Sequence, residues 1–105
     1  MAFRIPKQMT PQEVAARLKS GEPLMLLDVR EPAEWAEGHV VGAQNIPLGQ
    51  LGERRNELDP KRETIVICRS GNRSGLACEL LGEQGYDVVN MTGGLLQWTD
   101  ELVRD

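Results

Sequence analysis

The feature that most constrains the fold of this chain is a run of four residues, Thr64 to Ile67, all of which are β-branched. Such a run is typical of a strand that is covered on both faces in a parallel sheet, rather than of a half-exposed strand. Cys68 follows at the carboxyl end of this predicted strand. In open α/β sheets, ligands bind outside the carboxyl ends of the strands, where helices begin. The sequence therefore predicts that Cys68 lies at a ligand-binding edge.

A short loop, residues 69–73, separates this strand from a helix predicted over 74–84, with Gly85 as its C-terminal stop. Gly71 and Asn72 tolerate positive φ, so the loop can curl and direct successive N–H groups inward as an anion-binding nest. The helical spacing of four apolar residues predicts the buried face of the helix: Leu76, Ala77, Leu80 and Leu81. Cys68 would face the nest.

The same loop favours ionisation of Cys68. A thiol is a poor nucleophile until it is ionised, and a helix N-terminus with neighbouring arginines can lower its pKa from about 8.5 to roughly 3.5–7.5. The chain carries a net charge of -4, yet no acidic residue occurs between Glu63 and Glu79, whereas Arg69 and Arg73 both do. We therefore predict that Cys68 is a thiolate at neutral pH and that its substrate is a small anion.

Strands and helices are predicted to alternate along the rest of the chain, which favours an α/β fold with a mainly parallel sheet covered by helices on both faces. Further strands are expected at Phe3–Met9, Pro23–Val29, Ala43–Ile46 and Asp87–Met91. Helices are expected at Pro11–Lys19, Glu31–Glu37 and Leu48–Leu58, and a last one would place Leu95, Leu96, Trp98 and Leu102 on one face. The Thr10 to Glu13 segment predicts a capping box for the first helix. We expect one domain, residues 1–105.

Composition excludes several classes of function. Two cysteines and one histidine cannot complete a four-ligand zinc site, so we expect no metal and no cofactor. Cys78 is expected to be a free thiol in the core. The pI of 5.0 and the absence of a basic stripe argue against nucleic-acid binding. No segment approaches the roughly 18 apolar residues of a membrane span, so a cytoplasmic protein with no membrane partner is expected.

Three segments resemble the signatures of one known family, the rhodaneses, which are sulfurtransferases that carry sulfane sulfur as a cysteine persulfide. Cys68–Ser74 is similar to the family's active-site loop, Leu27–Ala43 to its amino-terminal signature, and Gly93–Trp98 to its carboxyl-terminal one. They occur in the family's order and at single-domain spacing, and the resemblance extends from about Met9 to Trp98. It implies a rhodanese-like three-layer domain with a mainly parallel central sheet flanked by helices.

The resemblance also implies a two-step reaction. The Cys68 thiolate attacks the outer sulfur of thiosulfate or a related donor, sulfite leaves, and cyanide or a thiol then attacks the Cys68 persulfide. Arg69 and Arg73 would attract the anionic donor, and the loop amides would stabilise the charge of the persulfide. The substrate-binding residues predicted in this way are Arg69, Ser70, Gly71, Asn72, Arg73 and Ser74.

Two further charged residues end the predicted strand over 23–29. Asp28 and Arg30 would lie at the same sheet edge as Cys68, where we expect them to brace loops rather than to take part in the chemistry. The resemblance points to the same role. His39, the only histidine, is expected to hold its own loop, because the mechanism needs no base to form the thiolate.

Other functions remain open at this stage. Phosphatases with a cysteine-centred phosphate loop place an arginine six positions after the cysteine, where this chain has Ser74, with Arg73 one position earlier. The shorter cradle suits sulfane sulfur better than a phosphoryl group, although phosphate or arsenate chemistry is an alternative. A persulfide carrier that delivers sulfur to a partner protein thiol is another. A catalytically silent interaction module is the third, and the intact Cys68 argues against it.

Overall fold

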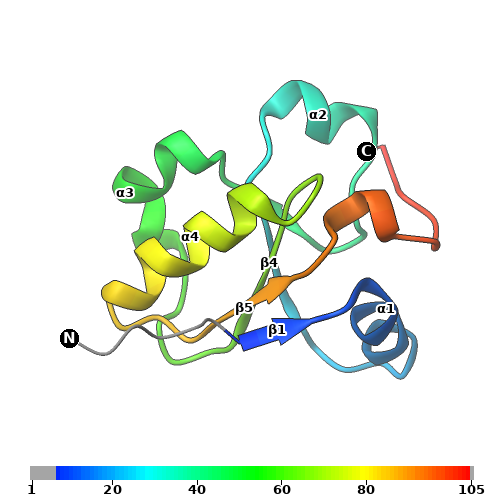
Figure 1. Ribbon diagram of the computed structural model, residues 1–105, viewed down its shortest axis with the longest axis horizontal. Coiled ribbons are helices and arrows are strands. Elements are labelled where there is room, and N and C mark those ends of the chain that lie inside the picture. The colour runs from blue at the N-terminus through cyan, green and yellow to red at the C-terminus, as the bar shows by residue number, and fades with distance from the viewer. Residues whose placement is uncertain (1–6, 105) are drawn as a thin grey trace.

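The computed structural model describes residues 7–104, which form an α/β fold around a five-stranded sheet (Figure 1). The strand order is β1-β5-β4-β2-β3 and every neighbouring pair is parallel. The strands are β1 (Lys7–Met9), β2 (Met25–Asp28), β3 (Gln44–Asn45), β4 (Thr64–Ile67) and β5 (Val88–Met91). The predicted fold class is therefore confirmed. The expected edge strand is β1, and the part of that prediction that covers Phe3 to Pro6 lies outside the described residues.

Helices cover both faces of the sheet. In Figure 1, α3 and α4 lie on one side of the strands, α1 lies on the other, and α2 lies beyond their carboxyl ends. The α-helices are α1 (Pro11–Lys19), α2 (Pro32–Glu37), α3 (Leu51–Arg54) and α4 (Asn72–Glu83). Short 3₁₀ helices are η1 (Leu48–Gln50), η2 (Arg55–Glu57) and η3 (Gly94–Gln97). No helix within 7–104 combines the length and apolar character of a membrane span.

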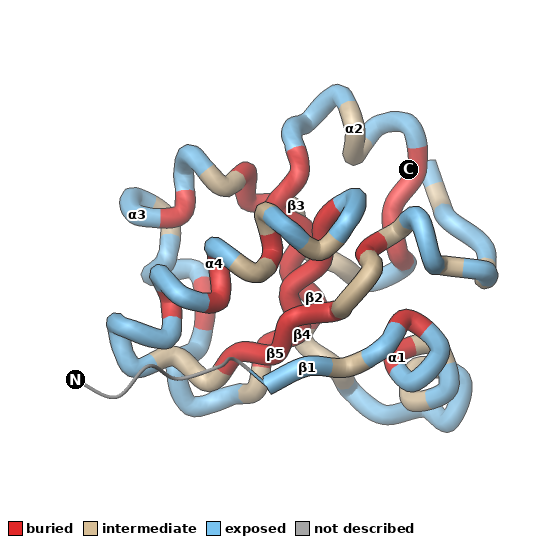
Figure 2. The backbone as a smooth tube through the Cα atoms, viewed as in Figure 1, coloured by how far each residue is buried: buried red, intermediate tan, exposed pale blue. Residues whose placement is uncertain are grey.

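The central strand β4 explains the β-branched run of the sequence. Successive side chains of a strand point to opposite faces. Val66 joins the core on the α4 side, whereas Ile65 and Ile67 join the core on the α1 side. All four β4 residues are buried, and Figure 2 shows the buried colour running through the centre of the sheet. The carboxyl end of β4, and thus Cys68, is fixed by packing on both sides.

The predicted capping box of α1 is present. The Glu13 N–H donates to Thr10 Oγ1 at 3.1 Å, and the Thr10 N–H donates to Glu13 Oε1 at 3.2 Å. The observed bounds of α1, Pro11–Lys19, are those predicted.

The α4 helix differs from its prediction in two ways. It begins at Asn72 rather than Ser74, because Gly71 already makes the turn with φ of +97°. Its buried residues are Ser74, Ala77, Cys78 and Leu81, whereas Leu76 and Leu80 are 47% and 45% exposed. Ser74 explains this outcome, because its buried contacts with Cys68 and Asn90 fix which face of the helix turns inward.

Two other helix predictions are wrong. The segment over 48–58 is broken into η1, α3 and η2, and it contains Gly49 and Gly52, which are poor helix formers. The helix expected to run through Leu102 ends with η3, because Trp98 adopts an extended conformation and Val103 pairs with His39 in an antiparallel bridge. As a result Leu96 and Leu102 are exposed, at 62% and 42%.

Candidate active site

The candidate nucleophile, Cys68, lies directly after β4 and is fully buried. Two groups contact its sulfur from the start of α4. The Gly71 N–H donates to Sγ at 3.0 Å, and Ser74 Oγ lies 3.4 Å from Sγ. The sulfur is therefore enclosed by polar groups at the N-terminus of a twelve-residue helix.

Only four residues, Cys68 to Gly71, connect β4 to α4. Of the two residues that tolerate positive φ, Gly71 adopts it and makes the turn, whereas Asn72 opens the helix. A Cβ at position 71 would also lie 3.1 Å from the Gly93 backbone nitrogen. The sharp turn and the close approach of the Gly93 backbone both favour glycine there.

The loop controls the ionisation of Cys68. Burial raises the pKa of the thiol, but the hydrogen bond that the Ser74 hydroxyl can donate to the thiolate and those from the amides of Ser74, Gly71 and Ser70 outweigh it, so that the net shift of the pKa is downward. At Cys78 the net shift is upward, because burial and, to a smaller extent, the charge of Cys68 raise the pKa of that thiol to about 12. Cys78 is thus a free, buried thiol, and Cys68 is the cysteine whose surroundings favour the thiolate.

A buried amide on the neighbouring strand completes this ring of contacts. Asn90, on β5, accepts the Ser74 hydroxyl proton at Oδ1 over 2.5 Å, and its Nδ2 donates to the Gly71 carbonyl at 3.4 Å. Asn90 was not predicted from the sequence. The available signal was a polar residue inside an otherwise apolar strand, one position from the carboxyl end that faces the loop.

The glycine pair of the carboxyl-terminal signature supports the loop through the backbone. The N–H groups of Leu95 and Leu96 donate to the carbonyls of Cys68 and Arg69 at 2.9 and 3.0 Å. A Cβ on Gly94 would lie 2.4 Å from the Arg69 carbonyl oxygen, too close for any side chain. This close approach holds the Cys68 loop against η3.

The two loop arginines occupy different environments. Both terminal nitrogens of Arg73 bond the carboxylate of Glu34 on α2, at 2.6 and 2.8 Å, whereas Arg69 is exposed. The hydrogen bonds from Arg73 lower the pKa of Glu34 to about 2. The local sequence of the loop contains no acidic residue, but the fold supplies one from 39 positions away. Sequence reasoning missed Glu34 for that reason.

The predicted bracing pair is buried beside this edge. Arg30 donates from Nε and Nη2 to the Asp28 carboxylate at 2.9–3.1 Å, and it also bonds the carbonyls of Gly38 at 2.7 Å and Glu34 at 3.2 Å. These contacts tie the end of β2 to the middle of α2 and to its C-cap, Gly38. Their geometry is that of a brace, and the functional role remains a prediction.

His39 is engaged within the same segment. Its ring stacks on Trp35 with centroids 3.5 Å apart, and its Nδ1 lies 2.9 Å from the Trp35 carbonyl oxygen. The other predicted substrate-binding residues, Ser70 and Asn72, are exposed at the rim of the loop. Within residues 7–104, no group of acidic, histidine and cysteine side chains has the arrangement of a metal site.

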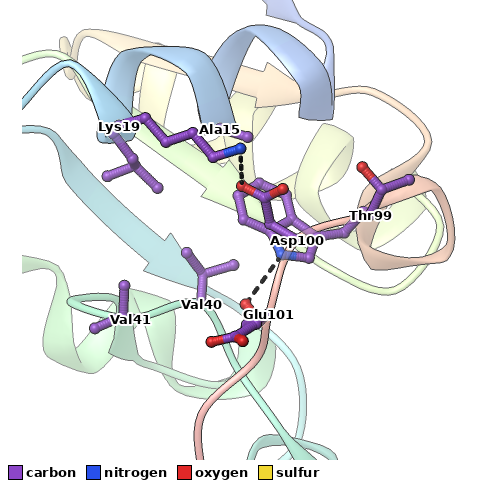
Figure 3. A pocket seen from close by; sticks show the side chains of 9 residues that line it. Ala15, Lys19, Val40, Val41, Thr99, Asp100 and Glu101 are labelled. Atoms are coloured by element: carbon purple, nitrogen blue, oxygen red, sulfur yellow. Dashed lines mark hydrogen bonds and ion pairs between the residues drawn. The ribbon is translucent and has the colours of Figure 1, made fainter.

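A separate open pocket of about 500 Å³ lies between α1 and the segment after η3 (Figure 3). Leu18, Val40 and Trp98 are among its apolar lining residues, and Lys19 pairs with Asp100 across it at 3.4 Å. None of the Cys68 loop residues lines this pocket. Its lining residues include no cysteine, so the Cys68 loop is the candidate active site.

Comparison with known proteins agrees with this geometry. The family model of the rhodanese-like domain matches residues 10–101. The curated "Sulfurtransferase" of Allochromatium vinosum is 36% identical over 92 residues, which are 87% of this chain and 86% of that protein. "Thiosulfate sulfurtransferase PspE" of Escherichia coli is 45% identical over 71 residues, 66% of this chain and 68% of that protein. The crystal structure of a rhodanese-like domain protein from Staphylococcus aureus superposes with a TM-score of 0.89 at 31% identity, covering 94% and 98% of the two chains. This chain therefore belongs to the family of rhodanese-like domains, whose curated members include sulfurtransferases.

Proposed function

We propose that this protein transfers sulfane sulfur from thiosulfate or a similar donor to cyanide or a thiol through a persulfide on Cys68. The observation that carries the proposal is the environment of that sulfur. Burial alone would keep the thiol protonated, yet the Ser74 hydroxyl and the loop amides lower its pKa. A buried cysteine with a lowered pKa at a helix N-terminus is suited to attack a small electrophile.

The reaction balances without a cofactor. The Cys68 thiolate forms a bond to the outer sulfur of the donor, the sulfur–sulfur bond of the donor breaks, and sulfite leaves with the electron pair. In the second step, cyanide or a thiolate attacks the outer sulfur of the persulfide and the Cys68 thiolate is restored. The Gly71 N–H, 3.0 Å from Sγ, is placed to stabilise the thiolate that attacks in the first step and the thiolate that is restored in the second.

The loop arginines would recruit an anionic donor. Arg69 is the exposed cation at the rim, and Arg73 would contribute its remaining N–H donors while Glu34 holds it. Ser70, Asn72 and the Gly71 and Ser74 amides would complete the binding site. Replacing Arg73 by alanine should therefore weaken the use of thiosulfate more than the use of an uncharged persulfide donor; equal losses would remove the electrostatic role.

A protein thiol is the second candidate acceptor, which would make this protein a carrier in a sulfur relay. The observation that favours it is Leu96, which is 62% exposed beside the active loop and is linked to it by the bond from its N–H to the Arg69 carbonyl. An apolar side chain at the rim suits a protein surface better than cyanide. A carrier would release sulfur slowly to cyanide and rapidly to a partner thiol. A cytoplasmic location remains a prediction from the sequence.

Steady-state kinetics with thiosulfate and cyanide test the proposal. We expect parallel double-reciprocal lines, the pattern of a covalent two-step mechanism, in the wild type. Cys68→Ser should abolish transfer while the circular dichroism spectrum stays unchanged. Cys78→Ala is the matched control, since it removes the other thiol and should retain activity. Activity in Cys68→Ser, or its loss only in Cys78→Ala, would contradict the assignment of the nucleophile.

A further inference from the structure

We propose that Asn90 is a positioning residue that governs the ionisation of Cys68 by controlling which neighbour receives the single hydroxyl proton of Ser74. The inference rests on the proposed function only in taking Cys68 as the nucleophile. It concerns a resting-state equilibrium of the protein, so it can be measured without any sulfur donor.

When Cys68 is a thiol, the protons of Cys68 and Ser74 are both donated within the buried group formed by Cys68, Ser74 and Asn90. The Cys68 S–H donates to Ser74 Oγ over 3.4 Å, and the Ser74 hydroxyl in turn donates to Asn90 Oδ1 over 2.5 Å. A serine hydroxyl has one proton to donate, whereas an amide oxygen can only accept. Each atom of this chain therefore has a partner, and the short contact with Asn90 holds the serine proton away from the sulfur.

This arrangement of hydrogen bonds is no longer satisfied when Cys68 loses its proton. The thiolate can only accept, so Ser74 must turn its proton toward Sγ in order to stabilise it. Ser74 Oγ and Asn90 Oδ1 would then face each other at 2.5 Å with no proton between them. Two acceptor oxygens at that distance, without a proton between them, repel each other. In its present orientation, Asn90 therefore favours the protonated state of the nucleophile.

A half-turn of the Asn90 carboxamide removes this conflict. It would bring Nδ2 to Ser74, so that the amide donates to Oγ while Ser74 donates to the thiolate. The cost is the long 3.4 Å bond from Nδ2 to the Gly71 carbonyl. That carbonyl keeps a second donor, because the Gly75 N–H bonds it at 3.1 Å. The thiolate state therefore requires Asn90 to rotate and to give up its bond to the Gly71 carbonyl, whereas the thiol state does not, so Asn90 favours the thiol.

A comparison of Asn90→Leu in two backgrounds tests this role. Leucine keeps the branched shape of asparagine but neither accepts nor donates, so the Ser74 proton is free to turn to the sulfur. We expect the thiolate-to-thiol ratio of Cys68 at a fixed pH to rise by about threefold or more, which is a pKa decrease of about half a unit. In the Ser74→Ala background the same substitution should change the ratio by less than about twofold, because the proton that Asn90 controls is absent.

The readout is the ultraviolet absorbance of the thiolate during a pH titration, with the Cys68→Ser protein subtracted as the background. This absorbance needs neither reagent access nor sulfur transfer, so a failure here is distinct from a failure of the proposed function. If Asn90 only braces the loop, its loss would misplace the amides around Sγ and raise the Cys68 pKa in both backgrounds. That result, or an equal shift with and without the Ser74 hydroxyl, would overturn the proposal. Circular dichroism checks folding, and Asn90→Ala carries the same expectations if the leucine variant does not fold.

Discussion

Arg73 and Glu34 join the active loop to α2 through a two-pronged ion pair, with Nη1 and Nη2 at 2.6 and 2.8 Å from the two carboxylate oxygens. The pair cancels one of the two positive charges that the loop sequence supplies. An incoming anion therefore meets Arg69 as the exposed cation of the loop. The net charge around the Cys68 loop therefore depends on Glu34, which the fold brings there, as well as on the arginines of the loop sequence.

Neutralising Glu34 should favour a dianionic donor. A dianion about 8 Å from one added positive charge gains about 1 kcal/mol in water, so Glu34→Gln should raise kcat/KM for thiosulfate by about fivefold at low salt. High salt should erase the difference. Glu37→Gln is the matched control, because it removes one exposed carboxylate from the same helix. An equal rise in the control, or a fall in Glu34→Gln, would show that the pair serves another purpose.

The same ion pair predicts a pH dependence of stability. The pKa of Glu34 falls from 4.5 to about 2 through the hydrogen bonds from Arg73, so the folded state favours its ionised form. The stabilisation is complete above about pH 5 and is lost as the pH falls from about 4.5 toward 2. Because both side chains are partly exposed, we expect about 1 kcal/mol. Urea unfolding of the wild type and Glu34→Gln should differ by that amount at pH 7 and converge near pH 2. A constant difference across this range would contradict the prediction.

A methyl group at Gly94 should break the support beneath the loop. Its Cβ would lie 2.4 Å from the Arg69 carbonyl oxygen and 2.5 Å from that of Cys68, at a backbone φ of +59°. We expect Gly94→Ala to lower the free energy of unfolding by about 2–4 kcal/mol and to impair sulfur transfer. Gly42→Ala, at φ of +84° with no atom within 4 Å of the added Cβ, isolates the backbone strain and should cost about 1 kcal/mol. Equal unfolding energies for the two variants would refute the close-contact argument.

Removing the Arg30 guanidinium should be costly, because it leaves the Asp28 carboxylate buried without its counter-charge. The two side chains are 8% and 1% exposed. We expect Arg30→Met to lower the free energy of unfolding by about 3–5 kcal/mol. Arg54→Met, which breaks the exposed 2.8 Å pair with Glu57, should lower the free energy of unfolding far less and serves as the comparison. Denaturant unfolding measures both, and similar costs would mean that burial does not set the value of the Asp28–Arg30 pair.

The fold was predictable where the local sequence and the tertiary packing agree. The β-branched run of β4 suits a strand with two buried faces, and the Thr10–Glu13 capping box marks the start of α1. The prediction failed where tertiary contacts decide the outcome. Leu76 and Leu80 have helical spacing, but the polar contacts of Ser74 select a different face of α4 for burial.

The same distinction applies to the candidate site: its local contacts could be predicted from the sequence, whereas its contacts with distant segments could not. Cys68, Gly71 and Ser74 form a local unit, so their sequence spacing predicts that the structure brings them together. Asn90 reaches that unit from β5, and Glu34 reaches the adjacent Arg73 from α2. Their partners are fixed by the order of the strands and by the position of α2 beyond the sheet, neither of which a single stretch of sequence contains.

The mass of the intact protein, measured before and after incubation with thiosulfate, would show whether Cys68 takes up a sulfur atom from the donor. We expect a gain of one sulfur atom, about 32 Da, in the wild type and in Cys78→Ala but not in Cys68→Ser. Addition of cyanide should reverse the gain. No gain in the folded wild type, or a gain of the same size in Cys68→Ser, would contradict a thiosulfate-derived persulfide on Cys68.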